Sequence, residues 1–158
     1  MTTLILGLGN SLMGDDGFGV KAVTALSSRY RFSGDVRLLD GGTLGLDLLP
    51  YLEGVEHLLI IDALEMQAPP GKVFRLEGED VPRAFASKLS VHQMGIQDLL
   101  AVAELQGHLP NRLVVWGVQP QSIEMRLELT PAVAAALPEV VQGVVTELQD
   151  WGHAGQSV

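Results

Sequence analysis

An apolar run near the start of the chain, residues 4–8, passes through a glycine-rich loop into a helix, and this passage most constrains the fold. Gly7 and Gly9 let the backbone turn tightly where the expected strand ends. A strand that passes into a helix in this way is typical of α/β proteins, which build binding sites at such crossings. Asp15 and Asp16 put negative charge where a bound phosphate would sit, so the loop indicates a cation rather than an anion.

Strand and helix patterns alternate along most of the chain. We expect strands over residues 3–8, 36–39, 57–61, 72–76 and 112–118, and helices over 16–30, 44–52, 90–105 and 131–151. Ser90 begins the third helix with a capping-box pattern, and Pro138 is expected to break or kink the last one. This alternation predicts an α/β fold, a twisted, mostly parallel sheet of about five strands with helices on both faces. We expect at least one short antiparallel strand, because several connections are too short for a helical crossover.

Length and composition limit the organisation and location of the protein. With 158 residues the chain fits one domain, which we place at residues 1–151, followed by a flexible tail over residues 152–158. Every apolar run is shorter than the ~18 residues of a membrane span, and no signal-peptide pattern opens the chain. We therefore expect a soluble, cytoplasmic protein that does not bind membranes.

Cysteine content and charge limit the chemistry. The chain contains no cysteine, which excludes disulfides, thiolate ligands and a cysteine nucleophile. The formal net charge of −9 disfavours nucleic acid as a partner, since its binding depends on Lys and Arg. A cation or a basic protein surface suits this charge better, and an acidic surface that only maintains solubility explains it equally well.

Three polar side chains are expected beyond the carboxyl ends of the strands, where α/β proteins bind ligands. They are Asp16 after the first strand, Asp62 after the third strand and His92 at the start of a helix. A charged Asp62 buried alone would cost several kcal/mol, so it needs a cation, a hydrogen-bond donor or exposure. The helix dipole favours neutral His92, the form that binds metals. The three residues predict a divalent metal site; the alternatives are a turn cap at Asp62 and a structural role for His92.

Other motifs indicate less. The segment Asp40-Gly41-Gly42-Thr43 has one similarity to aspartic proteases, but no second copy exists to form a dyad, and a turn is the simpler interpretation. The chain has no Gly-x-Ser-x-Gly elbow and no His-Glu-x-x-His motif. A Rossmann-like dinucleotide-binding oxidoreductase needs a third glycine where Leu12 stands, so we expect no nucleotide cofactor. Surface or strand-end roles are expected for the remaining histidines, His57, His108 and His153.

Several motifs together resemble one family across nearly the whole chain. They are Gly7-Leu-Gly9-Asn10, Asp15-Asp16-Gly17-Phe18-Gly19-Val20, Leu39-Asp40-Gly41-Gly42-Thr43, Ile60-Ile61-Asp62-Ala63, Ser90-Val91-His92-Gln93 and Gly117-Val118-Gln119-Pro120. In this order they resemble the maturation endopeptidases of NiFe-hydrogenases. The resemblance implies a peptidase that removes the C-terminal extension of a NiFe-hydrogenase large-subunit precursor after nickel insertion.

The resemblance also implies the site. Asp16, Asp62 and His92 match the metal-contacting residues of the family, and Asp40 matches a further catalytic carboxylate. The implied metal is nickel supplied by the substrate. Many relatives carry Glu at the position of Asp16, so the side chain here is one methylene shorter. A nickel-dependent binding chaperone that does not cut the large subunit would carry the same residues and is the main alternative.

Overall fold

A five-stranded sheet forms the centre of the computed structural model, which describes residues 2–86 and 91–158. Its strands are β1 (Thr2–Leu8), β3 (Asp35–Gly42), β4 (His57–Ala63), β5 (Val73–Glu77) and β6 (Arg112–Val118), in the order β3-β1-β4-β6-β5. The first four strands of this order pair in parallel, while β5 runs antiparallel to β6 at the edge. The predicted mostly parallel sheet with a short antiparallel strand is confirmed.

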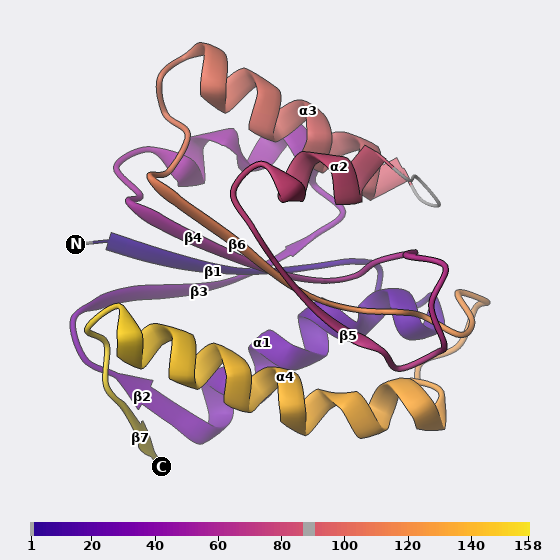
Figure 1. Cartoon of the computed structure of the whole chain (residues 1–158). Helices are drawn as coiled ribbons and strands as arrows, with labels where there is room; N and C mark the ends of the chain where they lie inside the picture. The colour runs from indigo at the N-terminus through magenta and orange to yellow at the C-terminus, as the bar shows by residue number, and fades with distance from the viewer. Residues whose placement is uncertain (1, 87–90) are drawn as a thin grey trace.

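Helices cover both faces of the sheet (Figure 1). On one face lie α1 (Phe18–Arg29) and α4 (Pro131–Asp150), and on the other α2 (Asp80–Ala86), α3 (Val91–Leu105) and the 3-10 helix η2 (Gly45–Leu52). Side chains alternate between the faces along each strand, so Ile5 packs with α1 and α4 while Leu4 and Leu6 pack with the opposite layer. This double burial explains why the three central strands, β1, β4 and β6, are apolar at most positions.

The chain leaves two neighbouring strands toward opposite faces of the sheet. After β1 it enters α1 on one face, whereas after β4 it passes through β5 to α2 and α3 on the other (Figure 1). In open α/β sheets, the carboxyl ends of two strands that diverge in this way are the usual place of a ligand site.

Several predicted elements differ in detail. The first helix begins with a 3-10 turn, η1 (Gly14–Gly17), before α1, and residues 45–52 form a 3-10 helix. Helix α4 is not broken at Pro138, because Ala134 and Pro138 are exposed and water can reach the carbonyl that proline leaves without an N–H donor. The capping box falls on Ser90, outside the described residues.

Part of the tail that was expected to be flexible, residues 152–158, forms a strand in the structure. Residues Gly155–Ser157 form β7, which pairs antiparallel with β2 (Tyr30–Phe32). His153 is buried, with Nε2 2.9 Å from the Thr3 hydroxyl and Nδ1 2.8 Å from the Ser33 carbonyl. A surface or strand-end role for His153 is therefore wrong as well. His57 does begin β4, and His108 is exposed, as expected.

No helix among the described residues is both long enough and apolar enough to span a membrane. The cytoplasmic location stays a prediction.

Candidate functional site at the carboxyl edge of the sheet

Three expected site carboxylates come from adjacent strands and their loops. Gly7 of β1 aligns with Asp40 of β3 on one side and with Ile61 of β4 on the other. Asp40 and Asp62 therefore lie on the strands flanking the end of β1, near the same level, and Asp16 lies in the loop that follows β1. The structure brings these parts of the chain to one edge of the sheet.

The loop after β1 closes tightly around Asp16. Gly9 has a φ of 123°, and a Cβ built there would lie 1.7 Å from the Asp16 carbonyl oxygen, so only glycine fits. The Asp16 carboxylate is buried and accepts a hydrogen bond from the Asn10 backbone N–H at 2.9 Å. These contacts fix both the backbone and the side chain of Asp16.

The start of α1 packs directly on the backbones of β1 and β4. A Cβ at Gly19 would lie 2.1 Å from the Ile61 carbonyl oxygen and 2.5 Å from that of Leu8. The absence of a side chain at this position lets the helix approach both strands. The loop that carries Asp16 is thereby held against the strand that carries Asp62.

Asp62 is fully buried at the end of β4, which excludes exposure as the way its charge is stabilised. It follows Leu58 and Ile60 at two-residue spacing, and those side chains pack in the layer that contains α3. The Asp62 carboxylate thus belongs to the face covered by α3. One of its oxygens, Oδ1, accepts the Ala63 backbone N–H at 2.8 Å, which helps to orient the group.

His92 belongs to the first turn of α3, as predicted. Its imidazole lies outside the described side chains. Among the side chains that are described, no three His, Asp or Glu residues form a group that could hold a metal ion. The role of His92 as a ligand beside Asp16 and Asp62 therefore stays a prediction.

Asp40 is exposed at the same edge of the sheet and forms a local turn. Its Oδ1 accepts the Gly42 backbone N–H at 2.9 Å, the arrangement of an Asx turn. The Gly42 carbonyl in turn accepts the Gly9 backbone N–H at 2.9 Å. Asp40 therefore belongs to a turn that is hydrogen-bonded to the loop carrying Asp16.

Asp15 has a role that sequence analysis missed. Its buried carboxylate accepts backbone N–H groups from Gln121, Ser122 and Thr130, and also the Thr130 hydroxyl, at 2.7–3.1 Å. Burial alone would raise the pKa of Asp15, but these hydrogen bonds outweigh it and lower the pKa. Asp15 thus anchors the segment 121–130 to the loop that carries Asp16. Nothing local in the sequence separates it from Asp16, since its partners lie over a hundred residues away.

Gln119 organises the loop that follows Asp62. Its side-chain oxygen accepts the backbone N–H groups of Met66 and Ala68 at 2.8 and 3.2 Å, and its nitrogen donates to Glu65 at 2.6 Å. The residue is buried at the end of β6, beside β4. Sequence analysis placed Gln119 in a motif without a role; it holds the backbone beyond Asp62 in place.

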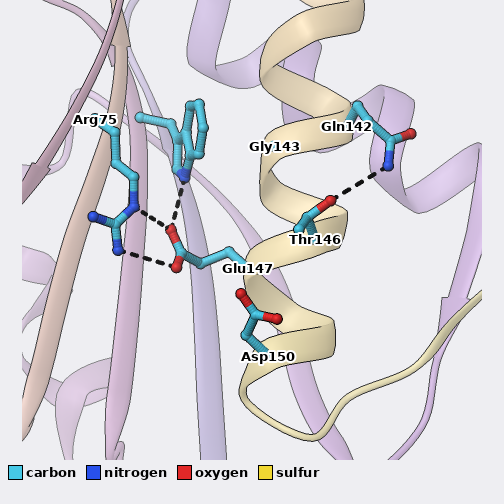
Figure 2. A pocket seen from close by; sticks show the side chains of 7 residues that line it. Arg75, Gln142, Gly143, Thr146, Glu147 and Asp150 are labelled. Carbon is cyan, nitrogen blue, oxygen red and sulfur yellow. Dashed lines mark hydrogen bonds and ion pairs between the residues drawn. The ribbon is translucent and has the colours of Figure 1, made fainter.

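A pocket of about 280 Å³ lies on the opposite face of the sheet, between β5, β6 and α4 (Figure 2). Glu147 accepts hydrogen bonds there from Arg75 at 2.7 and 3.1 Å and from the Trp116 ring at 3.2 Å. Hydrogen bonding to Glu147 raises the pKa of Arg75, with burial acting in the opposite direction. These polar groups satisfy one another, as the dashed lines in Figure 2 show, so this pocket is a structural feature of the α4 face.

Sequence comparison identifies similar proteins over most of the chain. The model of the hydrogenase maturation protease family matches residues 20–147. The chain is 42% identical over 151 residues to the hydrogenase expression/formation protein HupD of Rhodobacter capsulatus, a match that covers 94% of this chain and 72% of HupD. It is 39% identical over 153 residues to the hydrogenase 2 maturation protease of Escherichia coli, which covers 96% of this chain and 93% of the relative.

Solved structures share the fold. The hydrogenase-maturating endopeptidase HybD of Escherichia coli superimposes with a TM-score of 0.96 at 37% identity, covering 99% of this chain and 98% of HybD. The HybD maturation protease of Thermococcus kodakarensis gives a TM-score of 0.75 at 32% identity, covering 91% of this chain and 97% of that one. The match extends through the strands and loops that carry the carboxylates described above.

Proposed function

The chain belongs to the hydrogenase maturation protease family, and from this premise we propose that it removes the C-terminal extension of a NiFe-hydrogenase large-subunit precursor after nickel insertion. The observation that carries the proposal is the fully buried Asp62 at the carboxyl end of β4, on a strand held against the loop of Asp16. A carboxylate at such a place is suited to a charged ligand that arrives with the substrate.

In this proposal the precursor brings the nickel, and Asp16, Asp62 and His92 complete its coordination. Carboxylate and imidazole donors suit a first-row divalent ion. The start of a helix disfavours the protonated imidazole, which supports His92 as a neutral donor. Coordination would report that the precursor is loaded and would position the scissile peptide bond at the edge of the sheet.

Hydrolysis then adds the oxygen of water to the scissile carbonyl carbon, breaks the carbon–nitrogen bond and gives a proton to the leaving amine. The substrate's nickel polarises the carbonyl or activates the water. Asp40 is exposed beside the loop of Asp16, where a carboxylate can accept a proton from water or position it.

The mass of the precursor tests this function. The purified protein is incubated with nickel-loaded and with nickel-free precursor, and we expect loss of one discrete C-terminal peptide from the loaded form alone. A stable complex with an intact precursor would instead support the binding chaperone. Equal cleavage of nickel-free precursor would contradict nickel recognition.

Variants extend this test to the residues. Asp16→Asn, Asp62→Asn and His92→Ala should remain folded and lose cleavage. Asp150→Asn is the matched control, because Asp150 is an exposed carboxylate at the end of α4, the end away from the Asp15 loop, and it should cleave like the unmodified protein. A His92→Ala variant that cleaves normally would remove His92 from the site.

A further inference from the structure

The segment 123–129 has the residue alternation of a β-strand but belongs to neither sheet. Apolar residues alternate strictly with charged ones, in the order Ile123, Glu124, Met125, Arg126, Leu127, Glu128 and Leu129. Such alternation is typical of an extended segment with one apolar side. Within the described part of the chain, however, this segment joins neither the five-stranded nor the two-stranded sheet. Met125 and Leu127 are 83% and 64% exposed.

This segment lies against the loop that carries Asp16. The Arg126 backbone N–H donates to the Leu12 carbonyl at 3.0 Å, and the Arg126 carbonyl accepts the Gly14 N–H at 2.9 Å. Together they form a parallel bridge between Met13 and Arg126. In Figure 1 the orange loop after β6 passes beside the violet segment that follows β1. Leu12 is itself 56% exposed. We give the name apolar rim to the exposed residues Leu12, Met125 and Leu127, which lie on these two hydrogen-bonded segments.

Hydrogen bonds to Asp15 fix the segment that carries Met125 and Leu127. The Asp15 carboxylate accepts hydrogen bonds from Gln121, Ser122 and Thr130, at both ends of the segment that carries Met125 and Leu127. Asp15 and Asp16 are adjacent, so the same short turn fixes the rim and one proposed metal ligand. Side chains this apolar, exposed on an anchored backbone, are typical of a surface that another protein covers.

The charges beside the rim indicate the chemistry of what covers it. Glu124 and Glu128 flank Met125 and Leu127 and are exposed. Glu124, Arg126 and Glu128 together carry a formal charge of −1, with Arg126 4.0 Å from Glu128, so the segment is acidic. Asp40 adds a further exposed carboxylate at the same edge of the sheet. A partner segment with apolar side chains and neighbouring Lys or Arg complements this surface.

We infer that the apolar rim docks an extended, apolar segment of the large-subunit precursor that carries basic residues, next to the bond to be cut. This inference rests on the proposed function and adds the surface that selects the substrate. The hydrogen bonds that join the apolar rim to the Asp16 loop favour the precursor as its partner. A second copy of this chain carries a net charge of −9 and would be repelled by the carboxylates beside the apolar rim.

Charge substitutions in the rim test this inference. Met125→Asp and Leu127→Asp replace exposed side chains, so we expect the fold to be retained. Each should raise KM for nickel-loaded precursor about tenfold with kcat nearly unchanged. Leu105→Asp is the matched control, because Leu105 is 87% exposed at the end of α3, at the opposite edge of the sheet. Its KM should not change. Leu127→Ser serves as the second variant if an added charge perturbs folding.

A charge-neutralising variant tests the basic partner. Replacing Glu124 and Glu128 together by Gln should raise KM severalfold in low salt and by less in high salt, because screening removes the attraction.

The results distinguish failure of docking at the apolar rim from failure of the proposed cleavage. If the unmodified protein leaves nickel-loaded precursor intact, the proposed function fails. If it cuts the precursor and both rim variants keep the original KM, the docking inference is overturned. A rim that is instead buried between two copies would show as a dimer in ultracentrifugation that Leu127→Asp dissociates without any change in KM, and this too overturns it.

Discussion

The Asp15 carboxylate accepts both the backbone N–H and the hydroxyl of Thr130, at 2.7 and 2.8 Å, although the two residues are 115 positions apart. Thr130 is the residue before the first turn of α4. This contact therefore joins the loop of the proposed site to the start of the helix that covers one face of the sheet.

Replacing Asp15 by Asn should lower the free energy of unfolding by about 3 kcal/mol at neutral pH. The amide keeps only one acceptor oxygen, and its NH2 group would face backbone N–H donors. Urea unfolding measures the loss. The exposed Asp47→Asn is the control and should stay within about 0.5 kcal/mol of the unmodified protein.

The contribution of Asp15 should also depend on pH in a defined direction. Its folded-state pKa lies below the ordinary value of 3.8, so its stabilising effect is fully present above that pH and is lost as the pH falls through the folded-state pKa. The stability difference between the unmodified protein and Asp15→Asn should therefore shrink below about pH 3.8. A difference that is the same at neutral and acid pH would contradict the charged anchor.

Gly19→Ala should destabilise the protein by about 3 kcal/mol and reduce cleavage, although Ala favours helices. The added Cβ meets the carbonyl oxygens of Leu8 and Ile61, which belong to the sheet and cannot move aside. Thermal unfolding measures the effect. Gly54→Ala is the comparison, because no atom lies within 4 Å of a Cβ there and only its positive φ is penalised, by about 1 kcal/mol. Equal losses at both positions would contradict close packing as the cause.

His153→Ala should lower the free energy of unfolding by about 2 kcal/mol, because Thr3 and Ser33 lose their hydrogen-bond partner in the segment before the last strand. The same substitution at the exposed His108 should have little effect. If chemical denaturation shows no difference between the two variants, the hydrogen bonds of His153 contribute nothing to stability.

The fold was predictable where the signal is local. Short runs that are apolar on both faces, such as residues 57–61, favour central strands. The end of the chain was not predictable, because His153 is fixed by Thr3 and Ser33, which lie 150 and 120 residues earlier. No pattern within residues 152–158 indicates those contacts.

The candidate site was likewise predictable only where its residues follow from local sequence. The positions of Asp16 and Asp62 follow from strand ends, so the sequence predicts that they meet at one edge of the sheet. The division of roles between Asp15 and Asp16 depends on distant backbone N–H groups, and the role of Gln119 depends on the loop after β4. Such partners become visible only once the strands are side by side.

We propose that Asp16, Asp62 and His92 recognise the nickel of the precursor. The most direct test measures the affinity of the protein for nickel-loaded and nickel-free precursor, with Asp62→Asn beside it and circular dichroism to check its fold. We predict that the unmodified protein binds the loaded form at least about tenfold more tightly, a difference of about 1.4 kcal/mol, and that Asp62→Asn binds both forms alike. Equal affinity of the unmodified protein for the two forms would contradict the account.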